Sequence, residues 1–84
     1  MQLWILRPID VEEKDSLWYT PYDKMFGFVV RAKTEKIARR IAHRNGGDEN
    51  RSGKSPWLHG NLTTCERLTD NGHERLVMAD FNAG

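Results

Sequence analysis

The stretch from residue 26 to residue 46, FGFVVRAKTEKIARRIAHRNG, decides the fold of this chain because it joins a strand pattern to a helix pattern. Every second residue from Phe26 to Ala32 is apolar, and this period of two predicts a strand with one buried face. Thr34 is a suitable N-cap, since its hydroxyl can accept a hydrogen bond from an amide of the first helical turn. We therefore expect a strand followed directly by a helix that ends near Asn45.

The predicted helix has two unlike faces. Apolar residues recur at helical spacing on one of them: Ile37, Ala38, Ile41 and Ala42. Basic residues occupy the opposite one: Lys36, Arg39, Arg40, His43 and Arg44. We expect the apolar face to pack on a sheet and the basic face to remain in solvent. Gly46 can close the helix in the left-handed conformation that glycine tolerates.

Three further segments predict strands around this unit. Residues 2–7 are apolar on both faces, which is typical of an interior position in a sheet. Residues 62–68 and 74–81 flank a turn that contains Asn71 and Gly72, a favourable type I′ pair, and so predict a closing hairpin. The predicted fold is α+β, a four-stranded and mainly antiparallel sheet with one helix packed on one face, in the order β-β-α-β-β.

Length and composition predict a single small domain. The chain has 84 residues, of which 38% are hydrophobic, so residues 1–84 can form one modest core. The acidic and aromatic stretch near 9–25 and the polar stretch near 46–56 are expected to be mobile loops. Cys65 is the single cysteine of the sequence, which excludes an intrachain disulfide and favours the cytoplasm. No apolar run is long enough to predict a membrane span.

Charge is distributed unevenly along the chain. The net charge is +1, yet residues 31–54 hold eight Lys or Arg against three acidic residues. Such an asymmetry can be neutralised within the molecule, or it can orient the molecule against a charged partner. A solvated helix face explains the basic residues equally well, so the pattern by itself does not identify a ligand.

The connection from residue 9 to residue 25 is long and carries an aromatic cluster of Trp18, Tyr19 and Tyr22. Exposed rings would mark an anchor for a protein partner, whereas a domain of this size also needs rings in its core. Both interpretations stay open at this point. The candidate interaction surface combines the cluster with the helix: Trp18, Tyr19, Tyr22, Lys36, Arg39, Arg40 and Arg44.

No catalytic, metal or cofactor motif is present in the sequence. The stretch 47–55, GDENRSGKS, has five residues between its glycines where a phosphate-binding P-loop has four, and it follows a helix instead of a strand. His43, His59, Cys65 and His73 have none of the paired spacings of metal ligands. We therefore expect neither a catalytic site nor a bound metal or cofactor.

Two stretches read together, VVRAKTEKIARRIAHRNGGDE at 29–49 and TTCERLTDNGHERLVMADF at 63–81, carry a resemblance. In size and element order the chain resembles small uncharacterised proteins encoded by bacteria, phages and prophages. Some of these are similar in build to anti-CRISPR inhibitors, which implies a mode of action by occupying the surface of a host protein. The resemblance transfers no functional residues.

We expect a non-catalytic protein-binding or regulatory protein whose partner is another protein. Two alternatives remain open at this stage. The first is nucleic-acid binding through the basic helix face, because Lys and Arg neutralise phosphates. The second is a small-molecule site or an enzyme, which would require a concave pocket with convergent polar groups. The oligomeric state is open as well, since an edge strand can pair with its own copy.

Overall fold

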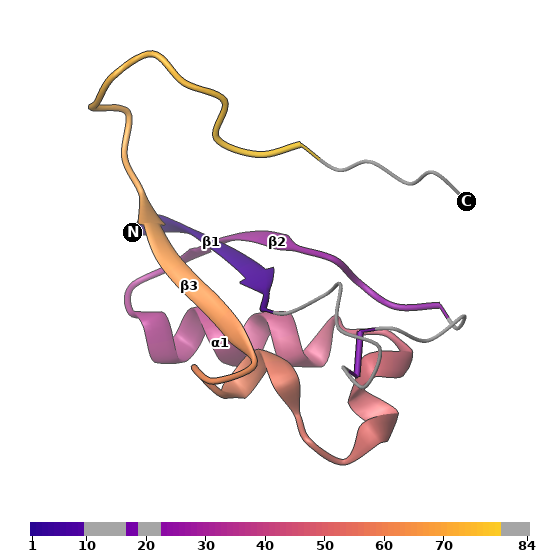
Figure 1. The fold of residues 1–84 in the computed structure, drawn as a ribbon. Coiled ribbons are helices and arrows are strands. Elements are labelled where there is room, and N and C mark those ends of the chain that lie inside the picture. Colours follow the sequence, from indigo (N-terminus) through magenta and orange to yellow (C-terminus); the bar gives the residue numbers. More distant parts are fainter. Residues whose placement is uncertain (10–16, 19–22, 80–84) are drawn as a thin grey trace.

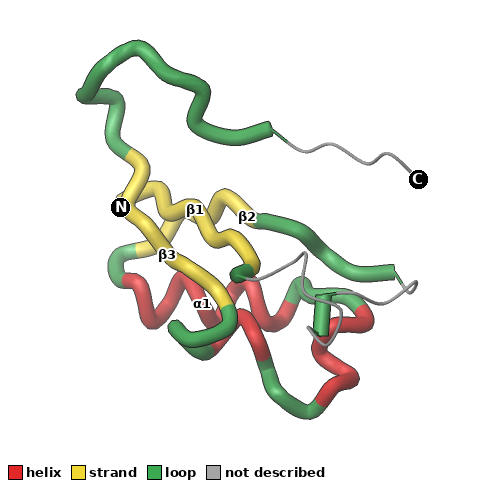
Figure 2. Tube along the Cα trace, viewed as in Figure 1, coloured by secondary structure: helices red, strands yellow, loops and turns green. Residues whose placement is uncertain are grey.

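The computed structural model describes residues 1–9, 17–18 and 23–79. Its elements follow in the order β1 (Gln2–Pro8), β2 (Phe28–Ala32), α1 (Glu35–Arg44), the short 3₁₀ helices η1 (Asp48–Ser52) and η2 (Pro56–Leu58), and β3 (Thr63–Leu68). The α+β class is confirmed. Figure 1 shows the sheet lying across α1, and Figure 2 shows α1 and the 3₁₀ helices on the same side of the sheet.

β1 is the central strand of a three-stranded sheet with the order β2-β1-β3, and both neighbours run antiparallel to it. The register places Ile5 opposite Val29 of β2 and opposite Glu66 of β3. The sequence predicted an interior position for this strand because it is apolar on both faces, and that prediction is confirmed.

The predicted fourth strand is wrong for the part of it that the structure describes. Residues 74–79 form no strand, and after Leu68 the chain passes over the sheet face that α1 does not cover (Figure 1). The expected type I′ turn needs a positive φ at both Asn71 and Gly72, but of these two residues only Gly72 has one. The chain therefore does not return alongside β3, and the observed order is β-β-α-β.

α1 begins as the sequence predicts and ends differently. The Thr34 hydroxyl accepts a hydrogen bond from the Ile37 amide at 3.2 Å, which confirms the N-cap. At the other end Gly46 does not adopt the predicted left-handed conformation. Instead Asn45 closes the helix, because its backbone amide donates to the Ile41 and Ala42 carbonyls and its side-chain amide donates to the Ile41 carbonyl.

The core lies between α1 and the inner face of the sheet. Its buried members are Leu6, Trp18, Val30, Ala32, Ala38, Ala42 and Trp57. The Trp57 ring is central, because it forms T-shaped contacts with both the Trp18 and the Phe28 ring, with centroid distances of 5.3 and 4.8 Å. Large rings thus supply the volume that the alanines of α1 leave open.

Residues 46–56, which the sequence predicts as a mobile polar loop, contain η1 and a buried carboxylate, Glu49. Most of the other predicted mobile loop, near 9–25, lies outside the described residues. Of the residues within it that the structure describes, Leu17 and Trp18 pack on the core. Both stretches therefore contribute apolar or polar groups to the interior.

Candidate interaction surface

The structure separates the residues that the sequence grouped into one candidate surface. Lys36, Arg40 and Arg44 are exposed on α1. Trp18 and Arg39 are buried, so neither belongs to an exposed surface. Tyr19 and Tyr22 lie outside the described residues. Among the described residues the candidate surface is therefore reduced to the outer side of α1.

Arg39 is a structural residue, and the prediction that it faces solvent is wrong. Only 8% of the residue is exposed. Its guanidinium donates to the Trp57 carbonyl at 3.2 Å, to the Thr63 hydroxyl at 2.8 Å and to the Thr63 carbonyl at 3.1 Å. Its Nε also pairs with Glu35 one helical turn earlier, at 2.9 Å. Arg39 therefore joins α1 to η2 and to the start of β3.

Trp18 is buried because it completes the aromatic core around Trp57. The sequence left two possibilities for this residue, an exposed anchor and a core ring, and the structure places it in the core. The physical reason is the narrow apolar stripe of α1, whose alanines leave space that rings must fill. An aromatic recognition cluster can no longer include Trp18.

Glu49 forms a second buried polar contact, which sequence reasoning missed. Its carboxylate accepts from the Trp57 indole N–H at 2.6 Å, from the Gly47 amide at 3.0 Å and from the Met25 amide at 3.0 Å. The residue is 3% exposed. An acidic residue in a polar, glycine-containing stretch gave no signal for this role, since the contact depends on Trp57 and Met25 from other parts of the chain.

The outer side of α1 contains a shallow hollow of about 390 Å³, lined by Ile37, Arg40, His43, Arg44 and Leu58. Its apolar members, Ile37 and Leu58, are 39% and 37% exposed. Arg40 and Arg44 have no ion pair within the described part of the chain. We call this set the α1 hollow. It presents aliphatic side chains next to guanidinium groups.

Cys65 lies on the core side of β3 and is not an activated nucleophile. Burial first, and then the Glu35 carboxylate, raise the pKa of its thiol from 9.0 to about 11, while Arg39 acts in the opposite direction. A reactive cysteine needs the opposite shift, toward the thiolate at neutral pH. The thiol therefore fills space beneath α1.

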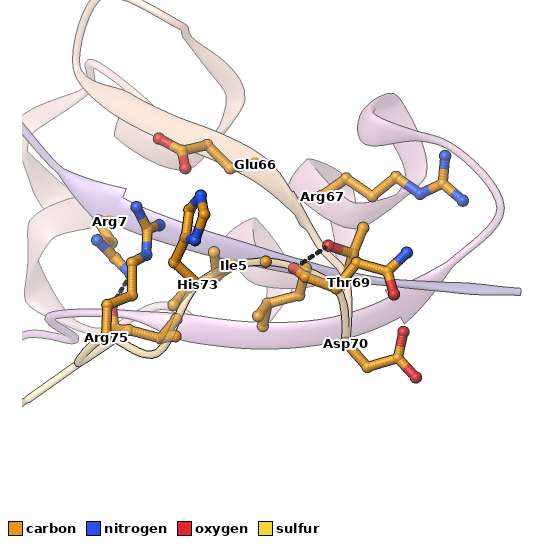
Figure 3. A pocket seen from close by; sticks show the side chains of 12 residues that line it. Ile5, Arg7, Glu66, Arg67, Thr69, Asp70, His73 and Arg75 are labelled. Atoms are coloured by element: carbon orange, nitrogen blue, oxygen red, sulfur yellow. Dashed lines mark hydrogen bonds between the residues drawn. The ribbon is translucent and has the colours of Figure 1, made fainter.

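A second depression lies on the outer face of the sheet. Residues 69–79, which we call the crossing segment, enclose a pocket of about 430 Å³ with β1 and β3. Its charged lining residues are Arg7, Glu66, Arg67, Asp70 and Arg75, and His73 accompanies them. Figure 3 shows Arg7, Arg75 and His73 toward one end of this pocket with Glu66 nearby, while Arg67 extends away from them.

Neither a metal centre nor a membrane-spanning helix is found in the described ranges. No group of three or more His, Cys, Asp and Glu side chains within them could hold a metal ion. None of the helices there is both long and apolar enough to cross a bilayer.

Comparison with known proteins finds no similar protein. No protein-family model matches the chain, and no curated protein or solved structure is significantly similar to it. The assignment of the candidate surface therefore depends on this chain's own residues.

Proposed function

We propose that this protein is a non-catalytic binding or regulatory protein that recognises an acidic protein partner through the α1 hollow. One observation carries the proposal: Ile37 and Leu58 are exposed beside Arg40 and Arg44. The partner that fits has an apolar side chain to fill the hollow and carboxylates placed to meet the two guanidinium groups.

The mixture of aliphatic and guanidinium groups suits protein recognition. Arginine is enriched in protein interfaces, because its planar fork pairs with carboxylates and its stem covers apolar surface. Apolar contact in the hollow would exclude water from the neighbouring ion pairs, which strengthens them. The excess positive charge of residues 31–54 would also steer an acidic partner toward this side of the molecule.

Nucleic-acid binding is supported less well by the same residues. Phosphates would pair with Lys36, Arg40 and Arg44, but bases stack best on aromatic rings, and the single aromatic ring that lines the hollow is that of His43, beside the aliphatic Ile37 and Leu58. Trp18, which the sequence offered as a stacking ring, is in the core. Nucleic-acid binding is therefore the alternative result that the experiment below is designed to detect.

The resemblance to phage and prophage proteins agrees with this mode of action. Inhibitors of the anti-CRISPR kind act by covering a host protein's surface, and a small domain with a mixed apolar and basic hollow can do the same. A phage or prophage origin and a cytoplasmic location stay predictions.

The test is affinity capture from host lysate, with and without nuclease, comparing the wild type with an Arg40→Glu, Arg44→Glu variant. Both residues are exposed, so the variant should fold. Arg39 is left unchanged because its reversal would disrupt the core. We expect one discrete acidic protein, retained after nuclease treatment and reduced at least about tenfold in the variant.

A matched control carries Lys33→Glu and Lys54→Glu. These residues are exposed outside the α1 hollow, and the variant has the same change in net charge. It should capture the partner as the wild type does. Recovery of nucleic acid alone would contradict the proposal, and so would an equal loss of capture in both variants, since the binding would then depend on overall charge.

A further inference from the structure

The pocket between the sheet and the crossing segment brings two guanidinium groups together without a paired carboxylate. Arg7 reaches it from β1, and its Nη2 donates to the Val77 carbonyl, which ties the crossing segment to the sheet. Arg75 comes from the crossing segment itself, and in the described structure it has no ion pair. Glu66 lines the same pocket, yet it forms no ion pair with either arginine.

Convergence of like charges is costly unless solvent or an anion separates them. The Nε of Arg7 is buried and has no hydrogen-bond acceptor among the described residues. An anion between Arg7 and Arg75 would offset their repulsion and accept from both guanidinium groups. His73, which lies toward the same end of the pocket in Figure 3, can add a further donor.

We propose that this pocket binds the phosphate group of a small phosphorylated molecule, with Arg7 and Arg75 as its ligands. Guanidinium groups match phosphate oxygens in pairs, and a phosphomonoester carries close to two negative charges at neutral pH. The Glu66 carboxylate repels any anion that enters the pocket. A phosphate, with nearly twice the negative charge of a carboxylate, is attracted more strongly by the two arginines. The volume of about 430 Å³ exceeds what phosphate alone needs and falls within the range of small-molecule sites.

The floor of the pocket suits the remainder of such a ligand. Ile5 of β1 is 4% exposed and Val77 lies in the crossing segment, so the two offer apolar surface beside the arginines. This site lies on the sheet face opposite α1. It is therefore independent of the proposed protein interface, and either one can fail without the other.

The test is an NMR titration of the full chain with inorganic phosphate and with glycerol 3-phosphate, and with acetate as the carboxylate probe, all at constant ionic strength. We expect saturable shifts of amides in residues 66–77 with both phosphate probes, and at least about tenfold weaker binding of acetate. Arg75→Gln should weaken phosphate binding by about tenfold or more, because a charged hydrogen-bonding partner is lost.

Arg31→Gln serves as the matched control, since Arg31 is an exposed arginine of β2 that does not line this pocket. It should bind phosphate as the wild type does. Non-saturable shifts up to about 10 mM would overturn the proposal, because a site of this kind should reach at least millimolar affinity. Equal binding of acetate, or equal binding by Arg75→Gln, would overturn it as well.

Discussion

The two sides of α1 use arginine in opposite ways. On the side that faces η2 and β3, Arg39 is buried and donates to the Trp57 carbonyl and to Thr63. On the solvent side of the helix Arg40 and Arg44 are exposed around the α1 hollow, next to Ile37 and Leu58. Adjacent residues of the same type thus differ in role because the helix turns each toward a different environment. Counting the basic residues of a helix therefore overstates the size of its binding face.

The largest effect should come from Arg39→Met, which keeps much of the side-chain volume and removes the guanidinium. Carbonyls of Trp57 and Thr63 would lose their charged donor inside the core. We expect a loss of about 3 kcal/mol in the free energy of unfolding, measured by urea denaturation. If Arg39→Met lowered the free energy of unfolding no more than Arg40→Met does, the distinction between a structural Arg39 and an exposed Arg40 would be wrong.

Glu49→Gln tests the same contrast between buried and exposed polar residues at Glu49, the second buried charged side chain. The carboxylate accepts hydrogen bonds from Trp57, Gly47 and Met25. A glutamine of the same shape has one acceptor oxygen and turns an amide donor toward other donors. We expect a loss of about 2 kcal/mol in urea unfolding. The exposed Glu74→Gln is the control and should leave the unfolding midpoint unchanged.

The reactivity of the Cys65 thiol shows whether reagents reach the region beneath α1. Because the pKa of its thiol rises from 9.0 to about 11, folding favours the protonated form. This contribution to stability should be complete below pH 9 and decline as the pH rises toward 11. Near pH 8 a disulfide reagent should react at least about tenfold more slowly with the native chain than with the urea-unfolded chain. Equal reaction rates for the native and the unfolded chain would show that the thiol is accessible in the native fold.

The smallest effect on stability is expected on the outer side of α1. Arg40→Met should change the free energy of unfolding by less than about 0.5 kcal/mol, since Arg40 is exposed and has no ion pair within the described ranges. Urea denaturation alongside Arg39→Met gives the comparison directly. A loss similar to that of Arg39→Met would assign Arg40 to the fold and weaken its role in binding.

Sequence patterns correctly predicted those helices and strands that are determined by residues close together in the sequence. The alternation before Thr34, the cap itself and the apolar run of β1 were all readable, since each depends on neighbours in the sequence. The fourth strand was not, because residues 74–79 make contacts that are distant in sequence, such as the hydrogen bond from Arg7 to the Val77 carbonyl. A favourable turn pair does not force a hairpin when the chain can cover an apolar residue such as Ile5 on the sheet face instead.

The role of Arg39 was partly readable from the helix. It lies one residue after Ala38 and three before Ala42, the two fully buried alanines, so it borders the buried arc. Its partners could not be read, because Trp57 and Thr63 approach it through the 3₁₀ turn and the start of β3. The α1 hollow was hidden for a similar reason, since Leu58 comes from η2.

The most direct test of the central claim, that the α1 hollow recognises a protein through combined apolar and basic contacts, is the affinity of an Ile37→Lys variant for the captured partner. Ile37 is exposed and lysine favours helices, so the fold should persist. We predict at least about tenfold weaker binding, because the apolar contact is lost although positive charge is gained. Unchanged or tighter binding would contradict the claim and indicate recognition by charge alone.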